Sequence, residues 1–163
     1  MDLVLDPPRG VAPIMLGMTL DEAVAAVPDG WGAPRVWREP GPAKACWDLD
    51  HVDVQALVEG GTHVTAIELW WPGECRTSST RVLIEGDEVF TTPAEDLFRS
   101  AAARGWTVDT SDPEYPVIPG VSLGFTRQTS QEAEEDADGF PRHVTSVLVG
   151  GPDYYDFRYE ERG

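Results

Sequence analysis

Hydrophobic and polar positions alternate with a period of two along much of this chain, and that period predicts short β-strands. Val52, Val54, Ala56 and Val58 alternate with Asp53, Gln55 and Leu57, which places one side of a strand on a core. Segments 44–48 and 62–71 flank this strand. Together the three segments predict an antiparallel meander, with glycines in the second hairpin loop.

Two helices are predicted from their first residues. Thr19 and Glu22 have the spacing of a capping box, in which the threonine hydroxyl accepts from the backbone N–H of Glu22 and the carboxylate accepts from that of Thr19. Thr92 and Glu95 predict a second box, and Gly105 marks the end of that helix. Further strands are predicted over 14–18, 81–84, 106–109, 121–128, 143–149 and 154–159, and a loop over 28–42.

The two halves of the chain share a pattern. His63-Val64-Thr65-Ala66-Ile67 returns as His143-Val144-Thr145-Ser146-Val147, each after a helix start of the same kind. We therefore predict one α+β domain over 1–163, built from two tandem helix-plus-antiparallel-strand repeats at about 11–73 and 81–153. The repeats are expected to form one sheet with the helices on one face.

The charge of the chain indicates which partners to expect and says little about the fold. The net charge is −17, from 29 acidic and 12 basic residues, and Lys44 is the only lysine, so nucleic acid is excluded as a partner. The first residues do not have the pattern of a secretory signal, and no apolar run is long enough to span a membrane. We expect a cytoplasmic protein without membrane contact. Cys46 and Cys75 are expected to be reduced packing residues.

Catalytic and ligand motifs are absent from the sequence. It contains no phosphate-binding glycine loop, no nucleophile elbow and no metal-ligand spacing, so we expect no metal, no cofactor and, on balance, no catalysis. His63 and His143 open the two repeated strands. If the repeats are related by a pseudo-twofold axis, these rings could face each other across the sheet, as a metal pair or an acid/base pair would; otherwise each caps the entry of a strand.

Aromatic residues suggest a surface for a partner. Trp70 and Trp71 are adjacent on one strand, so their side chains must point to opposite faces. One of them is then available on an open sheet face, beside Phe125 or Tyr155, unless the loop over 28–42 covers it. Further candidate contacts are the acidic residues Glu132, Glu134, Glu135, Asp136 and Asp138.

The run from Ile14 to Val24, Ile-Met-Leu-Gly-Met-Thr-Leu-Asp-Glu-Ala-Val, resembles the opening of BamE-like and β-lactamase-inhibitor-protein-like modules. The whole chain also looks like small acidic proteins of GC-rich bacteria. The resemblance implies short helices packed on an antiparallel sheet. In the inhibitor-like relatives, two such modules form a concave sheet that grips another protein. The second half departs from the motif, with Gly86 to Thr92 in place of Gly-Met-Thr.

Three hypotheses follow. The first is non-enzymatic binding of another, basic protein, as an inhibitor or immunity protein does. The alternative is a small-molecule-binding protein or enzyme with a cleft between the repeats, using His63 and His143. The third is a homodimer that pairs through its exposed sheet face.

Overall fold

The computed structural model describes residues 1–38, 41–73, 77–128 and 133–159. Within these residues the chain forms twelve strands in two sheets, two α-helices and three 3-10 helices. The predicted combination of helices and sheet is therefore confirmed, with strands in the majority. Neither helix has the length and apolar composition that crossing a lipid bilayer requires, as far as the described residues go.

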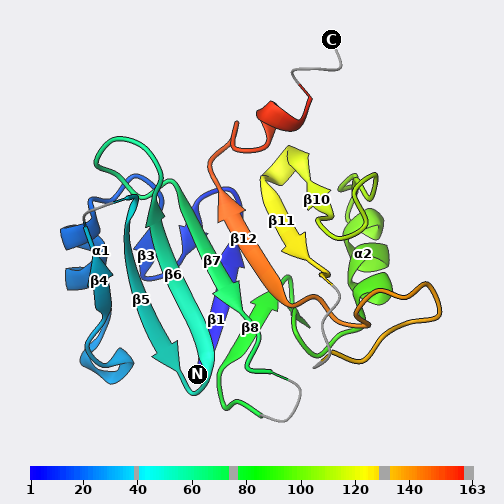
Figure 1. Cartoon of the computed structure of the whole chain (residues 1–163), viewed down its shortest axis with the longest axis horizontal. Helices are drawn as coiled ribbons and strands as arrows, with labels where there is room; N and C mark the ends of the chain where they lie inside the picture. Colours follow the sequence, from blue (N-terminus) through cyan, green and yellow to red (C-terminus); the bar gives the residue numbers. More distant parts are fainter. Residues whose placement is uncertain (39–40, 74–76, 129–132, 160–163) are drawn as a thin grey trace.

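The larger sheet has seven antiparallel strands in the order β10-β11-β12-β7-β6-β5-β4. These strands are β4 (Arg35–Trp37), β5 (Ala43–Leu49), β6 (Val52–Val58), β7 (Ala66–Trp70), β10 (Val117–Ile118), β11 (Leu123–Thr126) and β12 (Ser146–Gly150). The predicted meander is present as β5, β6 and β7. The two repeated pentapeptides lead into β7 and β12, which lie side by side at the centre of the sheet (Figure 1).

The smaller sheet has five strands in the order β3-β2-β1-β8-β9. They are β1 (Asp2–Asp6), β2 (Gly10–Val11), β3 (Ile14–Met15), β8 (Arg81–Ile84) and β9 (Asp87–Glu88). β1 and β8 are parallel, with Leu3 opposite Val82, and the other neighbours are antiparallel. The prediction of a single sheet is therefore wrong. Alternate apolar residues of β1 and β8 face the larger sheet, so these strands form a second layer and do not extend the first.

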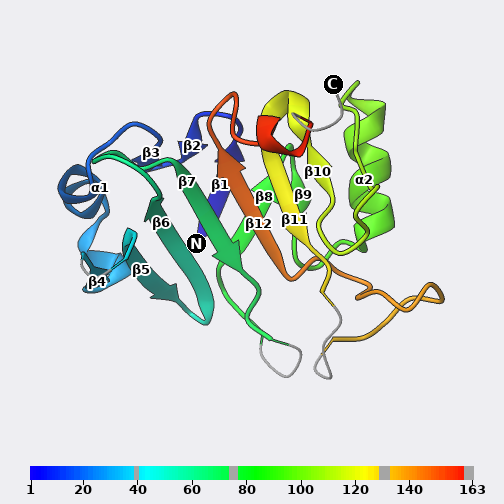
Figure 2. The same ribbon diagram turned by 45° about the horizontal axis from the view of Figure 1, so that its top comes forward.

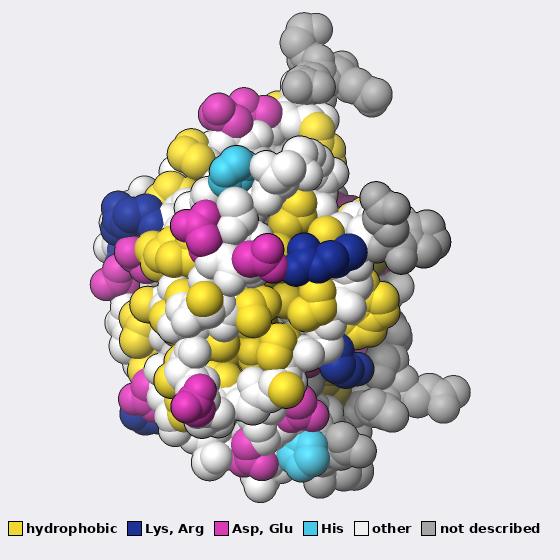
Figure 3. Space-filling model, turned by 90° about the vertical axis from the view of Figure 1, so that its left-hand side faces the viewer, with side chains coloured by type: hydrophobic (Ala, Val, Ile, Leu, Met, Phe, Trp, Pro, Cys, Tyr) yellow, Lys and Arg dark blue, Asp and Glu magenta, His cyan; other side chains and the backbone are white. Residues whose placement is uncertain are grey.

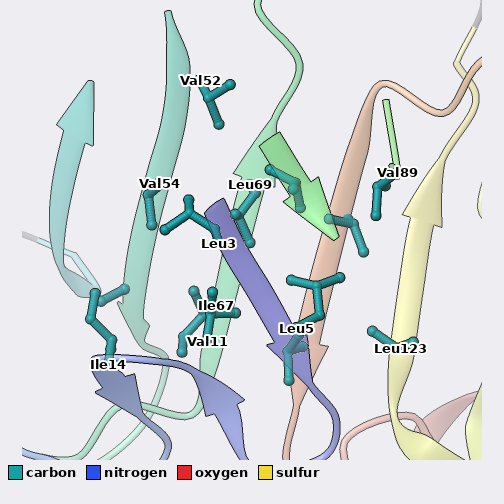
Figure 4. Packing of buried hydrophobic residues seen from close by; sticks show 14 of the residues in the cluster. Leu3, Leu5, Val11, Ile14, Val52, Val54, Ile67, Leu69, Val89 and Leu123 are labelled. Atoms are coloured by element: carbon teal, nitrogen blue, oxygen red, sulfur yellow. The ribbon is translucent and has the colours of Figure 1, made fainter. Parts of the chain in front are cut away.

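The main hydrophobic core lies between the two sheets (Figure 4). Leu3, Leu5 and Val11 of the smaller sheet lie opposite the larger sheet, in which β7 carries Ile67 and Leu69, and all five side chains are buried. Burial of one such side chain contributes about 1.5–3 kcal/mol. This contact holds the two layers together.

The helices lie at opposite ends of the molecule, α1 (Leu20–Ala26) beside β5 and β6, and α2 (Ala94–Ala103) beside β10 and β11 (Figures 1 and 2). The capping box at Thr19 and Glu22 is confirmed. The box predicted at Thr92 is wrong. Pro93 is the N-cap of α2 in an extended conformation and no side chain caps this helix, because the chain turns one residue later than the sequence pattern suggests.

Three other predicted segments differ from the structure. The loop over 28–42 contains a 3-10 helix, η1 (Asp29–Trp31), and the edge strand β4. Segment 106–109 is not a strand and contributes only a bridge between Asp109 and Val117. Segment 154–159 contains a 3-10 helix, η3 (Asp156–Arg158), because the chain turns back over the larger sheet after β12. The remaining 3-10 helix, η2 (Pro119–Val121), precedes β11.

Candidate functional site

One face of the seven-stranded sheet points away from the core, and we call it the outer face. Alternate residues of each strand lie on it, because side chains along a strand alternate between the two faces. On β4 to β7 these residues are Arg35, Trp37, Lys44, Cys46, Asp48, Asp53, Gln55, Leu57, Ala66, Glu68 and Trp70. On β12 and β11 they are Ser146, Leu148, Gly150, Gly124 and Thr126. Figure 1 shows no helix in front of β5, β6 or β7.

Trp70 lies on the outer face, between Asp53 of β6 and Ser146 of β12, and its side chain is half-buried. Trp71 follows β7 and lines a different space, together with Val52 and Val82. The two neighbouring tryptophans therefore serve two different surfaces. Of the predicted anchors, Trp70 is the one on the open sheet face.

Phe125 is not available to a partner. Its side chain is 3% exposed and lies on the core face of β11, where its ring meets that of Phe98 of α2 at 5.4 Å between centroids. Side chains along β11 alternate between the two faces, and Gly124 and Thr126 occupy the outer positions. Phe125 between them therefore points to the core.

The candidate acidic residues between Glu132 and Asp138 lie far from Trp70 in the sequence, and most of those that the structure describes are exposed. Glu134 lies 3.5 Å from the guanidinium of Arg142, and Asp136 lies 3.3 Å from that of the buried Arg127. Glu135 and Asp138 are exposed. Glu132 lies outside the described residues. Two of the four described carboxylates therefore already have a cation beside them.

Glu68 is the unusual charged group of the outer face. It sits in β7 between Gln55 and Leu148, and its side chain is half-buried. Burial raises the pKa of the Glu68 carboxyl, and the carboxylates of Glu59 and Asp53 raise it further. A hydrogen bond from Trp70 and the charge of Lys44 lower the pKa but do not offset the rise. Among the described residues, no cation lies within ion-pair distance of Glu68.

The segment after β12, residues 151–159, lies over the outer face, and we call it the C-terminal segment. The hydroxyl of Tyr154 donates to the Glu59 carboxylate, at 2.8 and 2.9 Å from its two oxygens. Burial and this carboxylate hold the pKa of Tyr154 far above its usual range. Tyr155 is buried, and its ring meets that of Tyr154 edge-on at 5.1 Å.

A cavity of about 470 Å³ lies between the C-terminal segment and the outer face, and we call it the outer cavity. Its charged lining residues are Glu59, Glu68 and Arg158. Its aromatic lining includes Tyr154, Tyr155 and Phe157. The cavity thus combines carboxylates with aromatic rings.

A second cavity of about 510 Å³, the edge cavity, opens beside Trp71 and Phe90. Arg81, Glu88 and His143 also line it. Hydroxyl groups come from Thr77, Ser78, Thr80 and Thr91. This is an amphipathic space of a size that suits a small molecule.

The two candidate histidines do not meet. β7 and β12 are antiparallel neighbours, with Ser146 opposite Trp70 and Gly150 opposite Ala66. His63 and His143 each precede the start of their strand, and the starts of antiparallel neighbours lie at opposite ends of the pair. His63 is exposed and lies beside Thr19 and Thr62, whereas His143 lines the edge cavity. A joint acid/base role is therefore ruled out by their separation.

At the β4 end, the outer face becomes mixed in charge. Trp37 is 44% exposed, with the Lys44 amine 4.9 Å and the Arg35 guanidinium 5.5 Å from its ring centroid. Figure 3 shows this end of the molecule, where hydrophobic side chains gather among acidic and basic ones. Cys46 is buried, which raises the pKa of its thiol. Cys75 lies outside the described residues.

Sequence reasoning missed Glu68 and Tyr154. The period-two pattern of β7 places Glu68 on the same face as Trp70, so a signal for Glu68 was present. No local signal points to Tyr154, because its role depends on the C-terminal segment turning back over β7 and β12. No group of three or more His, Cys, Asp or Glu residues within the described ranges is arranged to hold a metal ion.

Comparison of the chain with models of known protein families, with characterised proteins and with solved structures finds no match in any of the three.

Proposed function

We propose that the protein binds another protein through its outer face, around Trp70 and Glu68, without catalysing a reaction. One observation carries the proposal. A half-buried carboxylate without an ion pair among the described residues stands beside a half-buried tryptophan, on a sheet face that neither α-helix of the described chain covers. Tryptophan at such a position is a frequent interface hot spot, each contributing about 2 kcal/mol or more.

A basic partner suits this surface. The net charge of −17 attracts cationic proteins and raises their association rate, by about 10–10³ under favourable conditions. Glu68 and its neighbours Glu59 and Asp53 then supply local complementarity. An inhibitor or immunity-type protein that covers a basic target would use these same features.

The test is capture of partners from a native lysate at low and at moderate salt, with the wild-type chain and two variants as bait. Trp70→Ala removes the proposed anchor. Trp106→Ala removes a half-buried tryptophan elsewhere and serves as the matched control. We expect a stoichiometric basic partner that is retained by the wild type and by Trp106→Ala and is lost with Trp70→Ala.

Added salt should weaken this complex mainly through slower association, because charges at the rim act on the encounter. A partner bound equally well by Trp70→Ala, or at a rate independent of salt, would contradict the proposal.

The edge cavity supports a second candidate function, the binding of a small molecule. Its volume of about 510 Å³ and its lining by Trp71, Phe90 and His143 favour it. A thermal-shift screen of metabolites would test it, with His143→Ala expected to remove any stabilisation by a ligand. His63→Ala is the control, because His63 does not line this cavity.

A further inference from the structure

We infer that the outer cavity is a receptor for one organic cation, the guanidinium or ammonium group of an arginine or lysine side chain. The inference deepens the proposed function, since the side chain would be presented by the basic partner. The cavity's preference for a cation is nevertheless a property of this chain alone.

The lining has the composition that recognises organic cations. Tyr154 and Tyr155 contact edge-on at 5.1 Å, and Tyr155 and Phe157 lie 6.2 Å apart, so three rings stand together along the C-terminal segment. Glu68 lies on the floor that β7 provides. Aromatic faces attract cations, and a carboxylate in a partly dry site forms a strong charge-assisted hydrogen bond with one.

Two glycine positions in the sheet allow the rings that line the cavity to pack against the strands. A Cβ atom on Gly124 would lie 1.8 Å from the hydroxyl oxygen of Tyr155, and one on Gly150 would lie 2.4 Å from Cγ of Tyr154. The two rings therefore rest directly on the backbone of β11 and β12. The hydrogen bonds from Tyr154 to Glu59 fix the ring nearest the carboxylates.

The molecule already contains one example of the contact. The guanidinium carbon of Arg158 lies 5.7 Å from the centroid of the Tyr155 ring, and Arg158 donates to the backbone carbonyl of Tyr115 at 2.8 Å. Arg158 is engaged in these contacts. The lining contains two carboxylates, Glu59 and Glu68, and this one cation, so its net charge is negative. A cation entering beside Glu68 would neutralise a carboxylate that has no described ion pair.

The probe is N-acetyl-L-arginine amide, titrated into the full chain and followed by NMR shifts of backbone amides on β7 and β12. Its matched control is N-acetyl-L-citrulline amide, which has nearly the same shape without the charge. We expect saturable binding of the arginine probe with a Kd on the order of 1 mM, and binding of the citrulline probe about tenfold or more weaker.

Two variants locate the site. Glu68→Gln should weaken the arginine probe about fivefold or more, because it removes the charge but keeps the shape. Glu95→Gln, on an exposed position of α2, removes an equal charge elsewhere and should leave binding unchanged. Equal affinity for arginine and citrulline probes in the wild type would overturn the inference, and so would equal binding by the two variants.

The outcome is separable from that of the proposed function. Binding of the arginine probe without a captured partner would leave the cation site standing and refute the protein-binding function. A captured partner that Glu68→Gln binds as tightly as the wild type would refute the cation site alone.

Discussion

Two glycines in neighbouring strands decide where the C-terminal segment can lie. The ring of Tyr155 packs directly against the backbone of Gly124, and the ring of Tyr154 packs against that of Gly150. Neither glycine has a positive φ, so lack of space and not backbone conformation excludes a side chain there. The C-terminal segment can therefore line the outer cavity only because both positions are glycine and carry no Cβ.

Gly124→Ala tests this dependence. We expect a loss of about 1–3 kcal/mol in the free energy of unfolding, since an added methyl group in a packed site forces its neighbours to move. Urea unfolding measures it. Gly120→Ala, where a Cβ meets no neighbour within 4 Å, should change stability by less than about 0.5 kcal/mol. Equal losses at both positions would mean that Tyr155 does not rest on Gly124 in solution.

Glu68 makes stability depend on pH. Burial raises its pKa in the folded protein above that in the unfolded chain, so the folded state favours the protonated form. Its contribution to stability is present at low pH and is lost as pH rises through the folded pKa. Glu68→Gln should therefore raise the free energy of unfolding relative to wild type at about pH 7.5 more than at about pH 4.

Urea unfolding of both proteins at the two pH values measures this difference, with Glu95→Gln as the control for a general change of charge. The carboxylates of Glu59 and Asp53 face Glu68 and raise its pKa further, so they should enlarge the effect in the wild type. A variant that is destabilised more at the higher pH would contradict the assignment.

At the scale of elements, the two helices begin in different ways. In α1, Thr19 accepts from the backbone N–H of Glu22 at 3.1 Å, and Glu22 accepts from that of Thr19 at 3.2 Å. In α2, Pro93 is the N-cap and makes no side-chain cap bond. Only α1 therefore depends on its capping box, and α1 is the shorter helix.

Thr19→Ala should lower the free energy of unfolding by about 1 kcal/mol, the usual cost of losing an N-cap side chain. Thermal unfolding with circular dichroism measures it. Thr92→Ala is the matched control and should cost less, because Thr92 caps no helix. If Thr92→Ala proved the more costly, the assignment of Pro93 as the cap would be wrong.

Local patterns predicted the elements that neighbouring residues determine. The meander of β5, β6 and β7, the start of α1 and the opposite directions of Trp70 and Trp71 all follow from period and capping within a few residues. The second sheet could not be predicted in this way. Most of its strands are two residues long, and its central pair joins Asp2 to Arg81.

For the candidate site too, local patterns predicted some residue positions and not others. The position of Trp70 on an open face follows from the period of β7, whereas Phe125 needed the register of β11 against β12, which no local pattern contains. The opposite ends occupied by His63 and His143 follow from β7 and β12 being direct antiparallel neighbours, which the repeated pentapeptides alone do not indicate.

At the scale of the whole molecule, the two sheets are one stability unit because they share one core. Leu5 of β1 is buried in that core, whereas Val4 is 54% exposed on the other side of the same strand. Loss of packing in β1 should therefore weaken the whole fold and not merely loosen one edge.

Leu5→Ala should cost about 2–5 kcal/mol, the range for truncating a buried leucine. Val4→Ala in the same strand should cost less than about 0.5 kcal/mol. Urea unfolding followed by tryptophan fluorescence and by circular dichroism measures both. We expect the two signals to change together in Leu5→Ala, and separate transitions would show that the sheets unfold independently.

The parallel pairing of β1 with β8 has a consequence for synthesis of the chain. β1 is synthesised before β8, and this parallel neighbour follows 79 residues later, as counted from Asp2 to Arg81. A nascent chain that has reached only Trp70 can complete the meander and α1, while Leu3 and Leu5 lie in a strand with one neighbour missing. The second layer therefore closes only after Arg81–Ile84 has been synthesised.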